Sequence, residues 1–285
     1  MASAVFTVDS EGTATQPRMR WCMKDISYEH IDRSLIEGDE DLFYLLMSAS
    51  FIETGSDTYA ANLGEHYAGY PEIQHWLQGE WEHEELQHGA ALRRYVETVW
   101  PSFPWQEAYD SFFAEYSQLC TVEELFSDRR LEMVARCVVE TGTTAYYHTL
   151  RELSHEPVLT QLLSQIRNDE IGHFKYFLAG FKSLQQQAPV GRMRIAGTLY
   201  SRLKELRDSD SDVALRHVFA HKGELFSQPQ REFTDVAKRV YRLISTGLPA
   251  DLAVHMLLKP LLLSAKAEAW LRTPISKFAC KVMAY

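Results

Sequence analysis

The sequence predicts an all-α protein built around one large helical core. Apolar residues recur at helical spacing through several long segments, whereas alternating β-branched runs bounded by Asn-Gly or Asp-Gly turns are missing. Glycine and proline residues interrupt the helical pattern mainly where helices would be expected to end. With 285 residues, of which 46% are hydrophobic, the chain can bury a sizeable core.

Two long helices are expected in the first third of the chain. The first runs over 39–66 and ends in a glycine-rich stretch that leads to Pro71. The second begins near Pro71 and continues past Tyr95, until Pro101 and Pro104 break the pattern.

Three further helices follow in the middle of the chain. Residues 105–119 carry apolar side chains at helical spacing and predict a shorter helix. The Thr-Val-Glu-Glu sequence at 121–124 has the spacing of a capping box, which predicts the start of a long helix that reaches about Leu153. Pro157 suits the first turn of the next long helix, which continues to about Gln185.

The pattern changes after Gln187, where shorter amphipathic runs are separated by Gly, Pro, Asp and Ser. These runs predict helices that pack on the bundle, over 193–206, 213–221, 233–244 and 252–262. The expected organisation is a flexible N-terminal segment at 1–30, a four-helix bundle at 31–187 and a C-terminal helical extension at 188–285.

Composition argues against secretion and membrane insertion. The first 20 residues lack the apolar segment of a signal peptide, and no run of 18 apolar residues predicts a transmembrane helix. Cys22, Cys120, Cys137 and Cys280 lie far apart without a C-x-x-C pair, which favours reduced thiols over a disulfide framework or a zinc site. A cytoplasmic location is therefore expected.

The net charge of −10 is distributed unevenly along the chain. Residues 1–181 contain 12 Lys and Arg against 30 Asp and Glu, whereas residues 182–285 contain 17 against 9. One interpretation is that the early acidic residues are metal ligands or lie on solvated helix faces. The other is that the basic C-terminal part meets an acidic partner.

An internal repeat carries the chemistry. Phe-Ile-Glu-Thr-Gly-Ser at 51–56 resembles Val-Val-Glu-Thr-Gly-Thr at 138–143, and Glu-Glu-Leu-Gln-His at 84–88 resembles Asp-Glu-Ile-Gly-His at 169–173. Each half thus has one Glu on its first helix and a Glu-x-x-His motif on its second. A Glu and a His at positions i and i+3 project from the same side of a helical turn, so both can reach a metal ion between helices.

Four carboxylates and two imidazoles favour two iron or manganese ions over a structural zinc ion. Neighbouring apolar stripes on the same helix faces argue against the alternative that these groups merely lie on solvated surfaces. The six predicted metal ligands are Glu53, Glu85, His88, Glu140, Glu170 and His173.

Two other copies of the short motif are interpreted as non-ligands. Glu80 and His83 lie off the Glu85 face, and Glu152 and His155 lie off the Glu140 face near the expected helix end. The remaining histidines have no counterpart in the repeat and are also interpreted as non-ligands. They are His30, His66, His75, His148, His217, His221 and His255.

The repeat also suggests residues that support the ligands. Glu84 and Asp169 each precede a motif Glu, so Glu84 is expected to orient His173, and Asp169 to orient His88, unless both are surface acids. Thr143 and Thr144 follow Glu140 by about one turn. Their hydroxyls either face the metal groove or bond back to helix carbonyls.

At these motifs the chain resembles the ferritin-like di-iron oxidoreductases, and most closely the acyl-carrier-protein desaturases, over residues 39–184. The resemblance implies two iron ions, with Mn or mixed Mn/Fe as alternatives, and O2 as a co-substrate that drives desaturation, hydroxylation or N-oxygenation. It also implies an electron donor such as a ferredoxin-like protein or a reductase. A hydroxyl at the position of Thr143 or Thr144 would help to handle O2.

Other functions stay open at this point. A ferroxidase or iron-binding protein would use the same six ligands, although the roughly 100 additional residues favour binding of a substrate or partner. A di-iron RNA-modifying hydroxylase is also possible, but no recognisable RNA-binding motif is present. The basic C-terminal part is compatible with an acidic acyl or peptidyl carrier protein, and a homodimer is expected.

Overall fold

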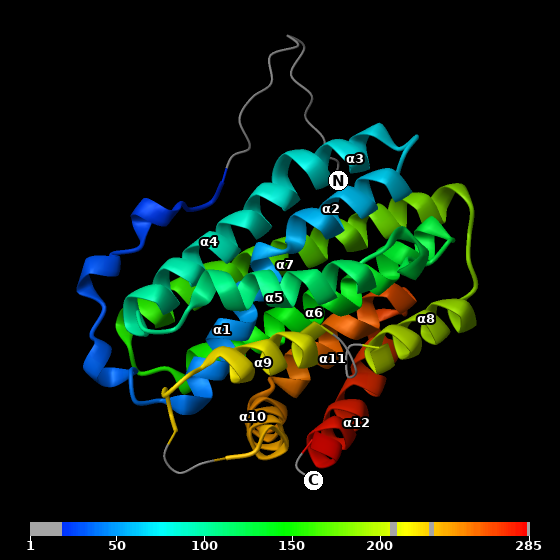
Figure 1. Ribbon diagram of the computed structural model, residues 1–285. Helices are drawn as coiled ribbons and strands as arrows, with labels where there is room; N and C mark the ends of the chain where they lie inside the picture. Colours follow the sequence, from blue (N-terminus) through cyan, green and yellow to red (C-terminus); the bar gives the residue numbers. More distant parts are fainter. Residues whose placement is uncertain (1–18, 206–209, 228–230, 284–285) are drawn as a thin grey trace.

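Four long helices form the centre of the protein. In the computed structural model, which describes residues 19–205, 210–227 and 231–283, these are α1 (Glu40–Thr54), α4 (Glu82–Val99), α6 (Arg129–Leu153) and α7 (Pro157–Gln187). Helix α1 packs on α4, α6 packs on α7, and contacts between α4 and α7 join the two pairs (Figure 1). No strand occurs in the described part of the chain, and the predicted all-α fold is confirmed.

The predicted helix over 39–66 is wrong in one respect, because the structure divides it at Gly55. Helix α1 ends at Thr54, and α2 (Ser56–His66) continues in a new direction. Gly55 packs tightly on α5, since a Cβ at this position would lie 3.2 Å from the Tyr116 ring. The break therefore follows from a close tertiary contact that the helical periodicity does not reveal.

The next predicted helix is continuous but irregular. It comprises α3 (Pro71–Trp76), a π-helical turn η4 (Leu77–Trp81) and α4. The π-helical turn lies directly before the Glu84–His88 motif. Such turns are rare and occur often at functional sites, because the extra residue changes the direction of the side chains that follow.

The expected capping box at 121–124 does not start a long helix. Residues Val122–Glu124 form only a short 3₁₀ turn, η5, after α5 (Trp105–Leu119). Helix α6 begins at Arg129 instead, where the Asp128 side chain accepts a hydrogen bond from the Arg130 backbone N–H. Asp128 is thus the N-cap, and the preceding residues place Leu125 in the core.

Helix α7 begins at Pro157 as predicted, and a buried carboxylate fixes its start. Glu156 accepts hydrogen bonds from the backbone N–H groups of Val158 and Leu159 at 3.2 and 2.7 Å. It also accepts one from the Tyr95 hydroxyl at 2.8 Å, so the cap of α7 is tied to α4. The backbone N–H groups in the first turn of this 31-residue helix, which have no acceptor within the helix, are thus paired with a buried carboxylate.

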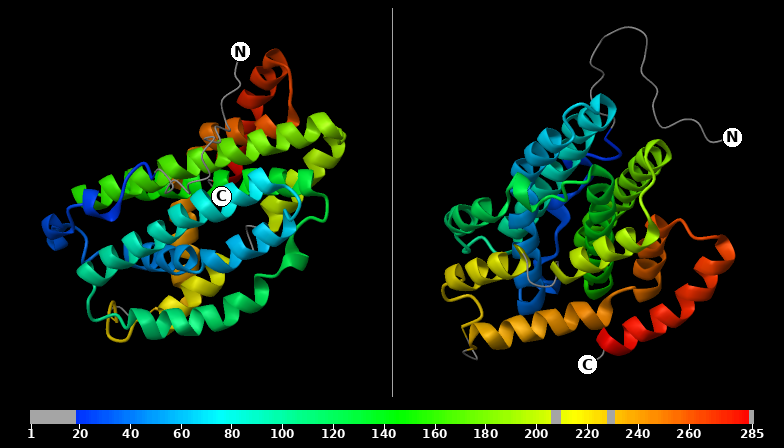
Figure 2. Two further views of the ribbon diagram at one scale, coloured as in Figure 1. Left: turned by 90° about the horizontal axis from the view of Figure 1, so that it is seen from above. Right: turned by 90° about the vertical axis from the view of Figure 1, so that its right-hand side faces the viewer.

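The C-terminal helices cover one side of the bundle. Helix α8 packs on α6, α9 on α1 and α5, and α11 on α6, while α10 runs across the bundle helices and contacts α1 and α6 (Figure 2). A final helix, α12, was not among the expected elements, and it contains Pro274 within its span. These elements are α8 (Arg192–Glu205), α9 (Asp210–His221), α10 (Phe233–Gly247), α11 (Ala250–Leu258), the 3₁₀ turn η7 (Lys259–Leu261) and α12 (Ala265–Met283).

The N-terminal segment differs from the expected flexible region at 1–30. Residues 1–18 lie outside the described residues, but 19–36 cross α4 and α7 in three short 3₁₀ turns, η1 (Met23–Asp25), η2 (Tyr28–His30) and η3 (Arg33–Leu35). Trp21 and Tyr28 are only 3% and 4% exposed. This part of the segment is therefore packed into the core.

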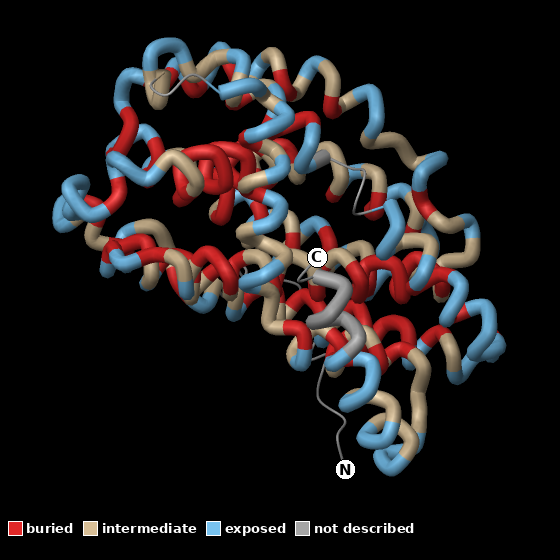
Figure 3. The backbone as a smooth tube through the Cα atoms, turned by 90° about the horizontal axis from the view of Figure 1, so that it is seen from below, coloured by how far each residue is buried: buried red, intermediate tan, exposed pale blue. Residues whose placement is uncertain are grey.

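The core is concentrated in the four central helices. Figure 3 shows long buried stretches on the inner helices, whereas the outer helices alternate between buried and exposed residues. The buried polar groups at the centre of the bundle are surrounded by apolar side chains of all four helices.

Within the described residues, no helix is both long and apolar enough to cross a membrane.

Candidate metal centre

The structure brings all six predicted ligands together in the interior of the bundle. Each is at least 93% buried. They form two groups whose ligand atoms lie within 4.8 Å of one another, and the two groups share Glu85 and Glu170. The first group consists of Glu53, Glu85, His88 and Glu170, and the second of Glu85, Glu140, Glu170 and His173.

Both histidines direct the same ring nitrogen into the cluster. His88 Nδ1 lies 3.3 Å from Glu170 Oε1 and 3.8 Å from Glu53 Oε2. His173 Nδ1 lies 3.1 Å from Glu85 Oε1 and 3.6 Å from Glu140 Oε2. Each imidazole thus faces carboxylates of both halves of the repeat.

The other ring nitrogen of each histidine faces a carboxylate that is outside the six. His88 Nε2 lies 3.2 Å from Asp169 Oδ2, and His173 Nε2 lies 2.8 Å from Glu84 Oε2. Each acid therefore contacts the histidine of the opposite half. A carboxylate that accepts a hydrogen bond from the Nε2–H group fixes the ring orientation and leaves Nδ1 free to bind a metal ion.

Asp169 is itself held by the N-terminal segment. Trp21 Nε1 donates a hydrogen bond to Asp169 Oδ2 at 2.6 Å, and Arg20 donates one to Oδ1 at 3.1 Å. The Trp21 ring is also nearly parallel to that of His88, with centroids 6.2 Å apart. Neither residue was predicted to be part of the site, because the segment lies outside the repeat that identifies the ligands.

Several polar atoms in the cluster lack a hydrogen-bond partner. His88 Nδ1, His173 Nδ1 and Glu170 Oε1 are buried and make no hydrogen bond within the described residues. Buried polar groups are normally satisfied, so unpaired ligand atoms that converge on one place indicate a missing partner. A metal ion is a suitable partner for four carboxylates and two imidazoles, and these buried groups could hold one.

The electrostatics of the cluster favour binding of cations. Burial raises the pKa of Glu140 to about 8, and burial together with the Glu85 and Glu170 charges raises the pKa of Glu53. Burial also opposes ionisation of Glu170, but the adjacent His173 and His88 rings outweigh it and lower the pKa of Glu170. The carboxylates thus repel each other unless protons or metal ions compensate their charge.

Thr143 and Thr144 occupy different environments. Thr143 Oγ1 donates a hydrogen bond to Glu170 Oε2 at 2.8 Å, so this hydroxyl reaches the cluster. Thr144 is fully buried, and its hydroxyl has no partner among the described residues. Of these two hydroxyls, only that of Thr143 forms a hydrogen bond with a predicted ligand in the described part of the chain.

Tyr147 is a further contact that was not predicted. Its hydroxyl donates a short hydrogen bond to Glu53 Oε1, and its side chain is 2% exposed. Burial and the neighbouring Glu53 carboxylate raise the pKa of Tyr147, which keeps its proton on the hydroxyl. Tyr147 follows Glu140 by seven residues, so the helical spacing could have indicated that it shares the Glu140 face.

The motif copies interpreted as non-ligands lie on the surface. Glu80, His83, Glu152 and His155 are all exposed.

Comparison with protein-family models gives no match for this chain, and comparison with curated proteins gives no significant similarity.

Proposed function

We propose that this protein binds two iron ions and catalyses an O2-dependent oxidation of a small or carrier-bound organic substrate. The observation that supports this most is the pair of overlapping ligand groups that share Glu85 and Glu170. Each carboxylate has two oxygen atoms, so a residue in both groups can serve two ions. A single tetrahedral ion would leave several of these buried groups unpaired.

The two halves of the repeat would each contribute three ligands. Bound iron would supply the electrons that reduce O2 and the oxidising power for desaturation, hydroxylation or N-oxygenation. Mn or a mixed Mn/Fe pair would fit the same donor atoms. Asp169 and Glu84 orient the histidine rings. Thr143 orients Glu170 through a hydrogen bond and places a hydroxyl at the edge of the cluster.

The surrounding apolar groups exclude water from the site. Trp81 and Phe177 are 4% and 0% exposed; Trp81 lies beside the His173 ring, and Phe177 packs on Trp81. A water-poor site protects a reactive oxidant from unproductive reactions and strengthens the electrostatic interactions of the buried ligands. This environment favours an oxidase or oxygenase over a site that exchanges iron freely.

The proposal includes partners that supply electrons or substrate. A ferredoxin-like protein or a reductase would return the iron to the reduced state between turnovers. An acidic acyl or peptidyl carrier protein would meet exposed basic groups of the C-terminal part, such as Lys204 on α8, and the chain would form a homodimer.

Metal analysis tests the proposal directly. Iron-reconstituted protein should contain close to two metal ions per chain, and Glu85→Ala or His173→Ala should reduce that content. Glu80→Ala and His155→Ala provide controls with exposed residues of the same type. Equal losses from both pairs, or a content of one ion or none, would exclude the proposed centre.

A further inference from the structure

A second cluster of buried polar groups lies next to the metal ligands on α6. We call it the Arg136 cluster; it consists of Glu132 and Arg136 on α6, Tyr59 on α2 and Arg202 on α8. Arg136 is 4% exposed and Glu132 is fully buried. Because Arg136 precedes Glu140 by four residues, the two are neighbours on one helix face, separated by about 6 Å along the axis.

One carboxylate serves both guanidinium groups. Glu132 Oε1 accepts a hydrogen bond from Arg136 Nε at 3.0 Å, and Glu132 Oε2 lies 3.8 Å from a terminal nitrogen of Arg202. Arg202 also lies 3.2 Å from Glu205, whose side chain is 50% exposed. Glu132 and, one turn further along α6, Glu140 are the buried carboxylates near Arg136, whereas Glu205 lies at the surface.

The Arg136 cluster contains more donors than acceptors. Among the described residues, Arg136 donates hydrogen bonds only through Nε, so its two terminal nitrogens have no acceptor. The Tyr59 hydroxyl and Arg202 Nε are buried and also lack a partner. The Arg136 guanidinium carbon lies 4.4 Å from the centre of the Tyr59 ring, and Arg202 approaches the same Glu132 carboxylate as Arg136 does.

We infer that the Arg136 cluster binds the carboxylate end of an organic acid that is the substrate. Unpaired buried donors are costly, and an arginine fork matches the two oxygens of a carboxylate. The buried Glu132 charge disfavours a dianion such as phosphate, so a monocarboxylate fits better. This inference rests on the proposed function, because the metal centre would act on the remainder of the bound molecule.

The position of Arg136 on α6 supports the same assignment. A molecule held at Arg136 and extended along the helix would pass the metal ligands first and then the Thr143 hydroxyl. The four residues at positions i, i+4, i+7 and i+11 of this face are Arg136, Glu140, Thr143 and Tyr147.

Binding of simple probes to the metal-free, full-length protein tests the inference. Isothermal titration calorimetry should detect sodium hexanoate, whereas hexanamide, which has the same chain but no charge, should bind at least tenfold more weakly. Inorganic phosphate should also bind more weakly than hexanoate. Equal binding of hexanoate and hexanamide would overturn the inference, and equal or tighter binding of phosphate would overturn the assignment to a monocarboxylate.

Two variants connect the binding to the Arg136 cluster. Tyr59→Phe removes only a hydroxyl that has no partner, so the variant should fold, and hexanoate affinity should fall by about tenfold. Arg136→Lys keeps the charge but loses the fork, and should weaken hexanoate binding further without changing hexanamide binding. Tyr70→Phe is the matched control, because Tyr70 also lies beneath an arginine, Arg129, but outside the cluster.

The outcomes separate this inference from the proposed function. Unchanged hexanoate binding in both variants would exclude the Arg136 cluster as the carboxylate site, even if two metal ions bind. Conversely, loss of the two-metal content in the ligand variants can be measured without any organic acid. A metal-free protein that binds hexanoate through Tyr59 and Arg136 would support the site whichever metal the centre holds.

Discussion

Each histidine of the candidate metal centre is oriented by a carboxylate from the other half of the repeat. Asp169 faces His88 and Glu84 faces His173, so neither half can assemble its own ligand geometry alone. This reciprocity explains why the acids sit directly before the motif glutamates. On α4 and α7 the preceding residue points toward the opposite histidine, while the glutamate points into the cluster.

Replacement of these acids should weaken metal binding without removing a ligand. Asp169→Asn and Glu84→Gln keep the side-chain shape but remove the negative charge that accepts a hydrogen bond from the histidine Nε2–H group. We expect metal affinity to fall about 10- to 100-fold. Competition with a chromophoric chelator measures the change. Glu80→Gln is the control on the same helical segment, and an equal effect there would indicate a general charge effect.

The two threonines should respond differently to substitution. Thr143→Val removes the hydrogen bond to Glu170, so the rate at which the reduced protein consumes O2 in a single turnover should change while metal content stays near two. Thr144→Val removes a buried hydroxyl that has no partner, and should leave this rate unchanged. If Thr144→Val altered the rate and Thr143→Val did not, the hydroxyl that affects O2 consumption would be that of Thr144 and not that of Thr143.

Sequence reasoning identified the residues of the cluster that belong to the repeat. Glu53 and Glu140, for example, stand in matching sequences, and the structure places both beside the two Glu-x-x-His motifs. Trp21 could not be found in this way, because its contact with Asp169 joins residues 148 positions apart and leaves no periodic signal. Sequence periodicity reports helix faces, but not which loop covers them.

At the level of elements, the first helix pair is held together by an unusually close approach. A Cβ added to Gly89 on α4 would lie 2.7 Å from the backbone nitrogen of Thr54 on α1. Gly89 follows His88, and Thr54 follows Glu53, so this contact sets the separation of two ligand-bearing helices. The glycine permits a spacing that no other residue allows.

Gly89→Ala should therefore destabilise the protein and disturb the metal centre. Overpacking at a rigid backbone contact typically costs about 1–3 kcal/mol, and displacement of α1 should also reduce metal content. Gly197→Ala is the matched control, since nothing lies within 4 Å of its added Cβ on an exposed face of α8. The control should stabilise the helix by about 0.5–1 kcal/mol, measured by chemical denaturation.

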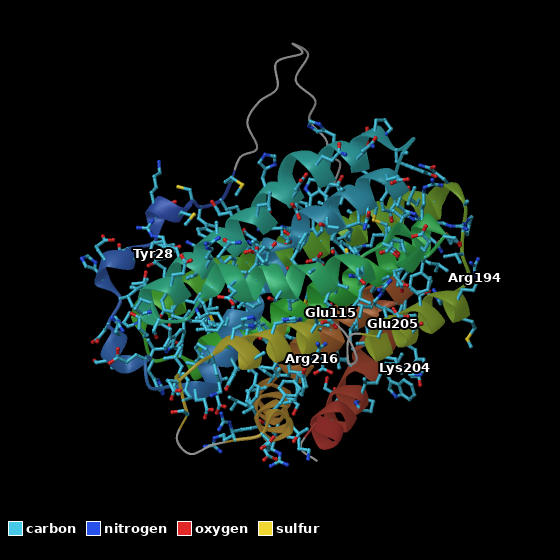
Figure 4. All side chains as sticks on the ribbon, viewed as in Figure 1. Tyr28, Glu115, Arg194, Lys204, Glu205 and Arg216 are labelled. Carbon is cyan, nitrogen blue, oxygen red and sulfur yellow. The ribbon has the colours of Figure 1, made fainter. Side chains whose placement is uncertain are left out.

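A surface ion-pair group connects α5 with α9. Arg216 and Glu115 lie side by side (Figure 4), and Arg216 donates hydrogen bonds to both oxygens of Glu115 at 2.9 Å. His217 Nε2 lies 3.0 Å from the same carboxylate. Arg216, followed by His217, lowers the pKa of Glu115 to about 2. Because Glu115 is 41% exposed, solvent limits the contribution of this group to below about 1 kcal/mol.

The stabilisation by Glu115 should depend on pH in a defined direction. Its folded pKa of about 2 is lower than the value of about 4.3 in an unfolded chain, so the contribution is fully present above pH 4.3 and is lost as pH falls toward 2. The difference in stability between the natural protein and Glu115→Gln should shrink over that range and in high salt. Glu107→Gln on the same helix should show neither trend.

The helix ends show where local sequence signals lose to tertiary contacts. The helices and their order were largely predictable, since apolar periodicity extends over many residues. The break at Gly55 was not, because a close contact with Tyr116 accompanies it. The start of α6 at Arg129 was missed for a different reason, because the local cap at Asp128 competes with the capping-box spacing at 121–124. The π-helical turn at Leu77–Trp81 has no sequence signature that single-chain periodicity could detect.

The uneven charge distribution has a structural role at the scale of the whole molecule. Basic residues of the C-terminal helices form ion pairs with acidic residues of the bundle. Some of the acidic groups that the basic residues were expected to meet therefore belong to the same chain. Arg239 lies 2.8 Å from Glu40, and Arg194 lies 3.1 Å from Asp128. The extension is thus attached electrostatically to the bundle as well as by apolar packing, and a separate partner would meet only the cations that remain.

The C-terminal extension on the α1 and α6 side of the bundle is one reason to propose an enzyme rather than an iron store. Storage requires repeated passage of iron through the centre, whereas a covered, water-poor centre suits one oxidation event per bound substrate. We expect the reduced protein to take up O2 once per di-iron centre and then stop until electrons are resupplied. An oxygen electrode combined with stepwise addition of ferrous iron measures this. Continuous oxidation of tens of irons per chain, with formation of a mineral, would contradict the oxygenase proposal but leave the six-ligand centre intact, because ferroxidase chemistry needs the same buried carboxylates and imidazoles.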